Sequence, residues 1–196
     1  MDGIILASAS TGRRDLFKKY FYDFTISISN FDENSIECKN PKEYVRILAL
    51  KKAEIISEKF PKEFVIGFDT IVLCEGKILG KPADIEEGKK MLRFLSGKKQ
   101  RVLSGYAVIH KEKKFNKSGV AETILLFKEL SDEFIEEYTT THPVTRFAGG
   151  YGIQNKDDFI SIITGSFDNV IGAPMKEVIE LLLEGGMKKK VLRKYS

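Results

Sequence analysis

The run of residues from Phe64 to Leu73 is the feature that most constrains the fold of this chain. Apart from Asp69 and Thr70, it contains only apolar side chains and one glycine. A continuous apolar run of this length is typical of a strand buried in a sheet. The shorter run Ile4–Ala7 has the same character. We therefore expect both segments to form buried strands.

Segments with helical periodicity interleave irregularly with further strands along the chain. We expect strands at residues 4–7, 64–73, 77–79, 102–110, 118–127 and 159–163, and helices at 13–20, 41–56, 85–95, from 131 onward, and 174–183. This order predicts an α/β fold with a mixed sheet. Because the chain has no internal repeat and no low-complexity linker, we expect a single domain over residues 1–196.

Composition indicates an ordinary globular protein, with 42% hydrophobic and 31% charged residues. No apolar run approaches the roughly 18 residues that cross a bilayer, and the N-terminus lacks the basic region of a signal peptide. Cys38 and Cys74 are too few for a disulfide framework, and Cys74 lies in the apolar strand, where we expect inert core. We therefore expect a cytoplasmic protein without a membrane partner.

The net charge of +4 is a mild excess that would attract phosphate-bearing ligands. It is too diffuse to indicate a nucleic-acid partner. The most concentrated basic run, Lys188–Lys190 with Arg193 and Lys194, is interpreted as a solvated tail, with contact to an acidic partner as the alternative.

The loop that follows the first strand is the first candidate site. Small residues there would let the backbone approach a phosphate, and Ser8 and Ser10 supply hydroxyl donors. Free N–H groups at the start of the next helix attract anions, and Arg13 and Arg14 can each grip phosphate oxygens through two bonds. The spacing is not that of a Walker A loop. The alternative is a capped helix with two surface arginines.

Asp69 is the second candidate, because a carboxylate within an apolar strand is costly unless it is paired or bound to a metal. Its position suggests that it binds a divalent cation or activates water. Lys81, in the segment Gly80–Pro82, could reach the same mouth of the sheet. The alternative is an acid that ends the strand and bonds to neighbouring amides.

The glycine-rich segment Ala148–Gln154 is the third candidate. Its glycines permit close approach to a ligand, Tyr151 could pack beside a base, and the amide of Gln154 could pair with uracil or thymine. A loop that needs positive φ angles explains the glycines equally well. His110 and His142 lack ligand-spaced partners, so we expect no structural zinc site.

Taken together, these segments resemble the Maf family of nucleotide pyrophosphatases. The resemblance follows the family's order from residue 4 to about residue 183. The matching segments are Ile4–Ser10 with Arg13–Leu16, Phe31–Glu33, Leu48–Ala49 with Lys52–Ala53, Ile66–Val72, Gly80–Pro82, Leu95–Gly97, Ser104–Gly105, Ala148–Gln154 and Gly165–Pro174.

The resemblance implies a fold related to inosine-triphosphatase-like enzymes, with an elongated mixed sheet flanked by helices and a cleft between two lobes. It implies a homodimer that hydrolyses free nucleoside triphosphates to the monophosphate and pyrophosphate with the help of Mg²⁺ or Mn²⁺. Water would attack the α-phosphorus, and pyrophosphate would leave.

Residue roles also follow from the resemblance. Asp69 falls on the family's proposed proton acceptor, Lys52 and Lys81 on its polar cleft positions, and Glu33 on an acidic cleft position. Our own hypothesis is that Lys52 and Lys81 assist catalysis and that Asp69 and Glu33 hold the cation. The expected substrate-binding residues are Ser8, Ser10, Arg13, Arg14, Thr70 and Gln154. Of these, Thr70 and Gln154 fall on positions linked to base preference and indicate dTTP and UTP.

Some positions depart from the common dTTP/UTP pattern. The first loop is one residue longer between Ser10 and Arg13, a length that resembles the branch acting on 7-methyl-GTP. Phe147 replaces a family lysine, Gln100 a frequent histidine, and Ser104 the usual threonine. The alternatives are therefore a 7-methyl-GTP pyrophosphatase and a nucleotide-binding regulator of septum formation with little turnover. A nucleic-acid-binding module that uses the basic tail ranks last.

Overall fold

The structure, a computed structural model, describes residues 2–153 and 158–193. Its strands are β1 (Ile4–Ala7), β2 (Thr25–Ile26), β3 (Phe64–Cys74), β4 (Lys77–Leu79), β5 (Lys99–His110), β6 (Phe115–Phe127) and β7 (Ile160–Thr164). Its helices are α1 (Thr11–Tyr20), α2 (Pro41–Ser57), α3 (Ile85–Leu95), α4 (Asp132–Thr141), α5 (Phe167–Ile171) and α6 (Met175–Glu184). Short 3₁₀ turns include η1 (Glu33–Ser35), η2 (Val144–Arg146), η3 (Ala148–Gly150) and η5 (Lys189–Val191).

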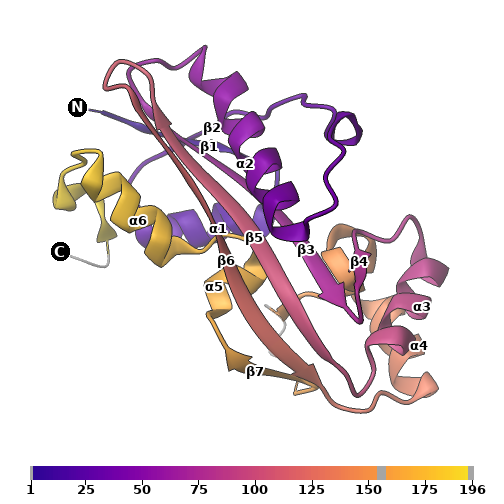
Figure 1. The fold of residues 1–196 in the computed structure, drawn as a ribbon. Helices are drawn as coiled ribbons and strands as arrows, with labels where there is room; N and C mark the ends of the chain where they lie inside the picture. Colours follow the sequence, from indigo (N-terminus) through magenta and orange to yellow (C-terminus); the bar gives the residue numbers. More distant parts are fainter. Residues whose placement is uncertain (1, 154–157, 194–196) are drawn as a thin grey trace. The chain divides into compact units, whose positions relative to one another are not determined.

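The strands form one mixed sheet with the order β2-β1-β3-β5-β6-β7, and β4 pairs with β3 (Figure 1). β1 lies parallel to both β2 and β3, whereas β4 runs antiparallel to β3 and β7 runs antiparallel to β6. The predicted α/β class with a mixed sheet is confirmed.

Two compact units divide the chain. Unit 1 comprises Met1–Asp69, Ser104–Ala121 and Gly172–Ser196, and unit 2 comprises Thr70–Leu103 and Glu122–Ile171. The long strands β3, β5 and β6 contribute residues to both units. The single domain over residues 1–196 and the cleft between two lobes stay predictions.

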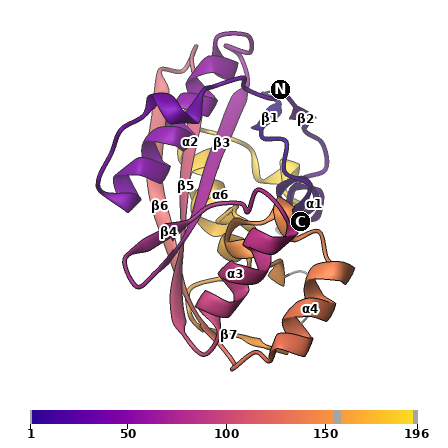
Figure 2. The same ribbon diagram turned by 90° about the vertical axis from the view of Figure 1, so that its right-hand side faces the viewer.

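Within unit 1, α2 covers one face of the sheet, and α1 and α6 cover the other (Figure 2). Side chains along β3 alternate between these faces. Gly67 faces α2, because a Cβ atom added there would lie 2.2 Å from the carbonyl oxygen of Ala49. Phe68 faces the other way and meets the ring of Phe17 from α1 at 5.9 Å. Asp69, two residues beyond Gly67, therefore points to the α2 side.

In unit 2, α3 and α4 lie side by side (Figures 1 and 2). Lys89 of α3 pairs with Glu136 of α4 at 2.7 Å, and Arg93 of α3 pairs with Asp132 of α4 at 2.6 Å. Arg93 and Asp132 are both exposed, so their pair contributes little to stability, whereas the Lys89 side chain is only 12% exposed. The apolar interior beneath them is made of Val72, Cys74, Leu92, Leu95, Val102, Leu125, Phe127, Ile135, Tyr138, Val144, Tyr151 and Phe159. Cys74 is thus core, as predicted.

Some element boundaries differ from the sequence-based expectation. α1 begins at Thr11 rather than at residue 13, because Ser10 caps the helix and accepts a hydrogen bond from the Arg13 N–H. β5 begins at Lys99 rather than at residue 102. The two-residue strand β2 and the five-residue helix α5 were not predicted, since segments this short carry no periodic signal. Among the described residues, none of the helices is both long and apolar enough to span a membrane.

Candidate active site

The predicted site residues of unit 1 lie where parallel strands end. β1 pairs with β3 as far as Ala7 and Gly67, and the chain leaves the sheet at Ser8. Asp69 follows at the corresponding level of β3. β2 runs parallel to β1 and leads into the segment that carries Glu33. Ligands of open α/β sheets bind at the carboxyl ends of the strands, so the register brings these groups to the edge where a ligand is expected.

The loop between β1 and α1 is held by its own hydroxyls. The buried Ser8 accepts a hydrogen bond at Oγ from the Ser10 N–H at 3.3 Å, and Ser10 Oγ accepts one from the Arg13 N–H at 3.4 Å. The start of α1 therefore has a defined shape, and its dipole favours an anion. Arg14 Nε is buried without a hydrogen-bond partner, and its nearest acid, Asp15, lies 3.7 Å away. Its guanidinium thus retains bonding capacity for a ligand.

Arg13 ties the loop to β3. Its Nη1 donates to Ser8 Oγ at 3.1 Å and to the carbonyl oxygen of Phe68 at 3.3 Å. Its Nε donates to the carbonyl oxygen of Gly172 at 2.8 Å. Because β1 no longer pairs with β3 beyond Gly67, the guanidinium supplies a donor that the neighbouring strand lacks at Phe68. The planar guanidinium of arginine directs its N–H donors at several separate acceptors at once. The single ammonium of a lysine could not reproduce this arrangement.

Asp69 and Lys52 form a buried ion pair beside this guanidinium. Lys52 Nζ lies 2.6 Å from Asp69 Oδ1, and the two side chains are only 12% and 9% exposed. The same nitrogen lies 2.8 Å from Oε1 of Glu33, whose side chain is about half exposed. Burial lowers the pKa of Arg13, and the charges of Asp69 and Glu33 oppose that shift. Two cations and two carboxylates therefore act on one another at this edge.

The close seat of α2 on β3 explains how Lys52 reaches Asp69. A Cβ atom at Gly67 would lie 2.2 Å from the carbonyl oxygen of Ala49 and 2.9 Å from the backbone nitrogen of Ala53. Any larger residue would therefore push the helix away from the strand. Lys52 precedes Ala53, and Asp69 lies two residues beyond Gly67 on the same face, so the glycine sets the spacing of the ion pair.

Asp69 and Glu33 fit a cation that is shared with a substrate. Mg²⁺ commonly takes one or two protein carboxylates and completes its shell with water and phosphate oxygens. The described residues contain no group of three or more His, Cys, Asp or Glu side chains that could hold a metal ion by themselves. The two acids face one nitrogen of Lys52, so both are directed at a position that already accommodates positive charge.

Two predicted site residues are assigned to unit 2, and a third is not among the described residues. Thr70 follows Asp69 along β3 and is assigned to unit 2, and the exposed Lys81 lies between β4 and α3 of the same unit. The Gly149 N–H donates to the carbonyl oxygen of Gly80 at 2.9 Å, so the glycine-rich loop adjoins the segment that carries Lys81. Gln154 is outside the described residues. The roles of these three residues stay predictions.

Tyr151 does not have the place suggested by the sequence. Its ring lies 4.8 Å from the ring of Phe127 within the core of unit 2, and only 4% of the residue is exposed. Burial raises the pKa of its hydroxyl above the usual range. The suggestion that Tyr151 packs beside a base was therefore wrong, because its ring is already enclosed by apolar side chains.

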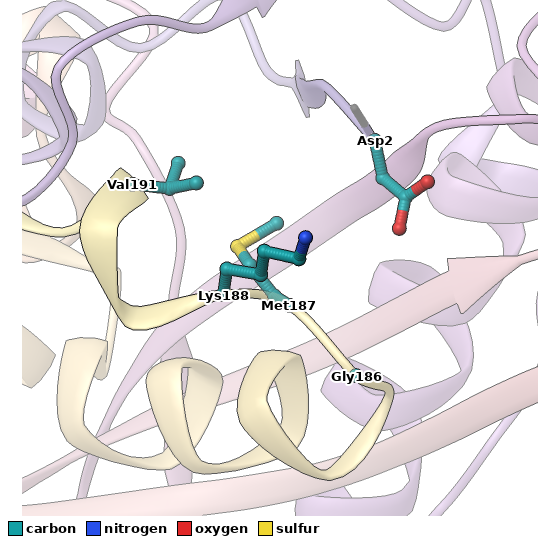
Figure 3. Close-up of a pocket in the computed structure, with 5 residues that line it drawn as sticks. All are labelled: Asp2, Gly186, Met187, Lys188 and Val191. Carbon is teal, nitrogen blue, oxygen red and sulfur yellow. The ribbon is translucent and has the colours of Figure 1, made fainter.

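A separate hollow of about 380 Å³ is lined by Asp2, Gly186, Met187, Lys188 and Val191 (Figure 3). It contains none of the predicted site residues. Asp2 is engaged by Lys113, whose hydrogen bond is the main cause of the lowered pKa of Asp2. We assign no function to this hollow.

Sequence reasoning missed two contributors to the site. The segment Gly165–Pro174 was matched to the family without a role, yet the Gly172 carbonyl holds Arg13. Tyr44 was not singled out in the sequence, whereas burial and then the charges of Asp69 and Glu33 raise the pKa of its hydroxyl. Its position eight residues before Lys52, two turns along the same helix, was the available signal.

Fold and site together define a mixed α/β protein with paired carboxylates and cations at the carboxyl ends of parallel strands. The chain belongs to the Maf-like protein family, because the sequence model of that family matches residues 3–185.

Similar proteins cover nearly the whole chain. A "dTTP/UTP pyrophosphatase" from Pyrococcus abyssi is 42% identical over 183 residues, which cover 93% of this chain and 96% of that protein. Proteins of the same name from Pyrococcus furiosus and Clostridium botulinum (strain Okra) are 41% and 42% identical, with 97% and 95% of this chain and 100% and 99% of theirs covered. The solved structure of the Staphylococcus aureus Ham1 protein aligns with a TM-score of 0.50 at 15% identity over 95% of this chain and 100% of its own, which shows the fold alone.

Proposed function

We propose that this protein hydrolyses free nucleoside triphosphates, dTTP and UTP foremost, to the nucleoside monophosphate and pyrophosphate. Relatives about 40% identical over more than nine-tenths of the chain bear the name of that activity. Membership of the Maf-like family supports the same reaction class.

One observation carries the proposal: Arg13 bridges the anion-binding loop and the strand residue next to Asp69. The guanidinium contacts Ser8 in the loop and the carbonyl oxygen of Phe68 in β3. A triphosphate held at the start of α1 would therefore lie close to a buried carboxylate. A capped helix with surface arginines would not require that link.

The reaction would proceed by attack of water on the α-phosphorus. A new P–O bond forms to the water oxygen, the bond between the α-phosphorus and the bridging oxygen breaks, and pyrophosphate leaves. Asp69 would accept the proton of the water. Arg13 and Lys52, with Arg14 and Lys81, would stabilise the negative charge on the phosphates as the bond breaks.

A divalent cation, Mg²⁺ or Mn²⁺, would be held by Asp69 and Glu33 and would neutralise phosphate charge. Lys52 bridges the two acids in the structure and offsets part of their negative charge. In the presence of substrate, its ammonium could turn to the phosphates, since three donors on a flexible stem can exchange partners readily.

The preferred base rests on the names of the relatives and on Thr70 and Gln154, which fall on the positions linked to base preference. A 7-methyl-GTP pyrophosphatase is the second candidate. It is favoured by one observation, the longer loop between Ser10 and Arg13.

The test incubates the purified protein with dTTP, UTP, 7-methyl-GTP and the other canonical triphosphates, in Mg²⁺, in Mn²⁺ or with a chelator. We expect metal-dependent release of pyrophosphate, fastest from dTTP and UTP. Asp69→Asn should lower turnover by orders of magnitude, whereas the exposed Asp23→Asn should not. Orthophosphate as the first product, or near-wild-type turnover of Asp69→Asn, would refute the proposed reaction.

The alternative function, a nucleotide-binding regulator of septum formation, differs from the proposed enzyme in its turnover. Such a protein would bind the same nucleotides and release almost no pyrophosphate from any of them. We further propose a homodimer in the cytoplasm, as the family resemblance implies. Sedimentation analysis that gives a mass near 22.2 kDa, the mass of one chain, would contradict the dimer.

A further inference from the structure

The segment Gly165–Pro174 matches the family without an assigned role, and its hydrogen bonds suggest one. The segment leads from the end of β7 through the short helix α5 to the start of α6 (Figure 1). Residues up to Ile171 are assigned to unit 2, and Gly172 is the first that is assigned to unit 1. The segment makes specific contacts within each unit, before and after this boundary.

Within unit 2, Asn169 anchors α5 to two strands. The Asn169 Nδ2 donates to the carbonyl oxygen of Val102 in β5 at 3.2 Å and to Thr123 Oγ1 in β6 at 2.9 Å. The Thr123 hydroxyl also donates to the carbonyl oxygen of Ser166 at 3.2 Å and accepts from the Ser166 N–H at 3.1 Å. Asn169 and Thr123 are both buried, and the threonine hydroxyl uses its donor and both lone pairs. Such a satisfied buried network holds α5 rigidly.

Within unit 1, Gly172 holds Arg13. It lies three residues beyond Asn169, and its φ angle of 97° is in the left-handed region that favours glycine. Its carbonyl oxygen accepts a hydrogen bond from the Arg13 Nε at 2.8 Å. Ala173 and Met175, which follow, are fully buried. The Gly172 carbonyl is therefore fixed along the chain from both directions.

The Gly172 carbonyl completes the set of acceptors that orients the guanidinium of Arg13. The Arg13 Nη1 donates to Ser8 Oγ and to the carbonyl oxygen of Phe68, whereas Nε is directed at Gly172. Because the guanidinium is planar, acceptors at two of its nitrogens determine the plane. A guanidinium that is already oriented binds phosphate oxygens with a smaller ordering cost. Without the Gly172 carbonyl in place, the plane could tilt about the Nη1 contacts.

We propose that Asn169 and Thr123 are positioning residues for the binding of the triphosphate. They hold the Gly172 carbonyl, which in turn sets the orientation in which Arg13 meets the phosphates. The inference rests on the proposed function and gives the segment Gly165–Pro174 its part in it. Both residues act through Arg13, so their effect should disappear when the guanidinium is absent.

The test variant is Thr123→Val, which keeps the shape of the side chain and removes the hydroxyl that Asn169 and Ser166 share. Thr123→Ser keeps the hydroxyl and serves as the conservative rescue. Thr139→Val is the matched control, because Thr139 is also a buried threonine of unit 2, and its hydroxyl bonds to carbonyl oxygens within α4. Each change is made in the wild type and in Arg13→Lys, which lacks the Nε–H that Gly172 accepts.

The measurements are kcat/KM for pyrophosphate release from dTTP, and the Kd of a dTTP analogue with a methylene bridge between the α- and β-phosphorus. Both are made at a temperature at which circular dichroism shows every variant folded. In the wild type, Thr123→Val should lower kcat/KM and weaken analogue binding by about 10-fold, because a small displacement of a binding group has effects of this order. Thr123→Ser should recover most of the loss, and Thr139→Val should match the wild type.

In Arg13→Lys, the further effect of Thr123→Val should be less than about 2-fold, because the two changes remove the same interaction. Equal factors in the two backgrounds would overturn the positioning role, since a merely structural loss acts with or without the guanidinium. A Thr123→Val variant with wild-type Kd and kcat/KM would overturn it as well. If Thr123→Val does not fold, Ser166→Ala replaces it in the same comparison: Ser166 is exposed, and its hydroxyl accepts from the Asn169 N–H at 3.1 Å.

Failure of the proposed function gives a different pattern. A wild type that binds the analogue and releases no pyrophosphate would overturn the reaction, and the Kd values in the two backgrounds would still decide the positioning role. A wild type that neither hydrolyses dTTP nor binds the analogue would overturn both.

Discussion

Replacement of Lys52 by methionine should destabilise the protein more than replacement of Asp69 by asparagine. Methionine keeps an unbranched apolar stem and removes the charge. Lys52→Met leaves the carboxylate of Asp69, only 9% exposed, without its cation. Asp69→Asn instead leaves Lys52 with the carboxylate of Glu33 at 2.8 Å. The asymmetry follows because only the first change leaves a buried charge unpaired.

The magnitude follows from the geometry of the pair. At 2.6 Å between Nζ and Oδ1, the Coulomb attraction is about 6 kcal/mol for an effective dielectric constant of about 20. Desolvation of the two ions offsets most of it, at several kcal/mol for each. Removal of one partner from a buried pair costs about 3–5 kcal/mol. We expect about 3 kcal/mol for Lys52→Met, at the low end because Lys52 retains some solvent contact, and about 1 kcal/mol for Asp69→Asn.

Urea unfolding followed by far-UV circular dichroism measures both values. The control is Lys51→Met. Lys51 is the adjacent, exposed lysine, and it pairs with Glu54 at the surface, so its replacement should change stability by less than about 0.5 kcal/mol. The double variant Lys52→Met/Asp69→Asn should recover about 2 kcal/mol relative to additivity. Equal losses in the two single variants would contradict the predicted asymmetry, and strict additivity in the double variant would show that the two side chains do not stabilise each other.

Three further outcomes are expected from single substitutions. Arg13→Lys cannot reproduce bonds to three acceptors, so kcat/KM for pyrophosphate release should fall about 10- to 100-fold; an unchanged value contradicts the bridge. Ser10→Ala removes the cap of α1 and should cost about 1 kcal/mol in urea unfolding, with Ser10→Asn largely restoring stability. Gly67→Ala places a Cβ atom against the backbone of α2 and should lower Tm steeply, whereas Gly80→Ala, with no atom within 4 Å of the new Cβ, should not; similar Tm values would argue against the close seat of the helix.

Long elements with a strong pattern could be predicted from the sequence, and elements set by tertiary contacts could not. The run that became β3 and the helix that Pro41 opens agree with the structure to within one residue at each end. β5 extends to Lys99 because its ladder with β6 continues: the Phe127 N–H donates to the carbonyl oxygen of Lys98 at 3.1 Å. Such long-range pairing leaves little trace in the local pattern.

The candidate site was likewise predictable where a local pattern reveals a residue, and not where tertiary contacts position it. The cost of a carboxylate in an apolar strand singled out Asp69 without any knowledge of its neighbours. Its link to Ser8 depends on the parallel register of β1 with β3, which no local pattern reveals. Lys52 entered only through the family resemblance, because its contact with Asp69 depends on the depth at which α2 is seated at Gly67. The carbonyl of Gly172 could not be predicted, since a backbone acceptor has no sequence signature.

Folding alone does not account for the ion pair between Lys52 and Asp69. A buried pair can often be replaced by apolar side chains of similar volume with neutral or favourable effect on stability, and the residues of β3 on either side of Asp69 are apolar apart from Thr70. A chain selected only for stability would have no reason to keep a carboxylate there. The variant Lys52→Met/Asp69→Leu separates the two explanations. If it unfolds at the same urea concentration as the wild type or higher and releases no pyrophosphate, the pair is retained for chemistry. If it fails to fold while Lys52→Met alone folds, the pair has a structural role that the apolar surroundings do not reveal.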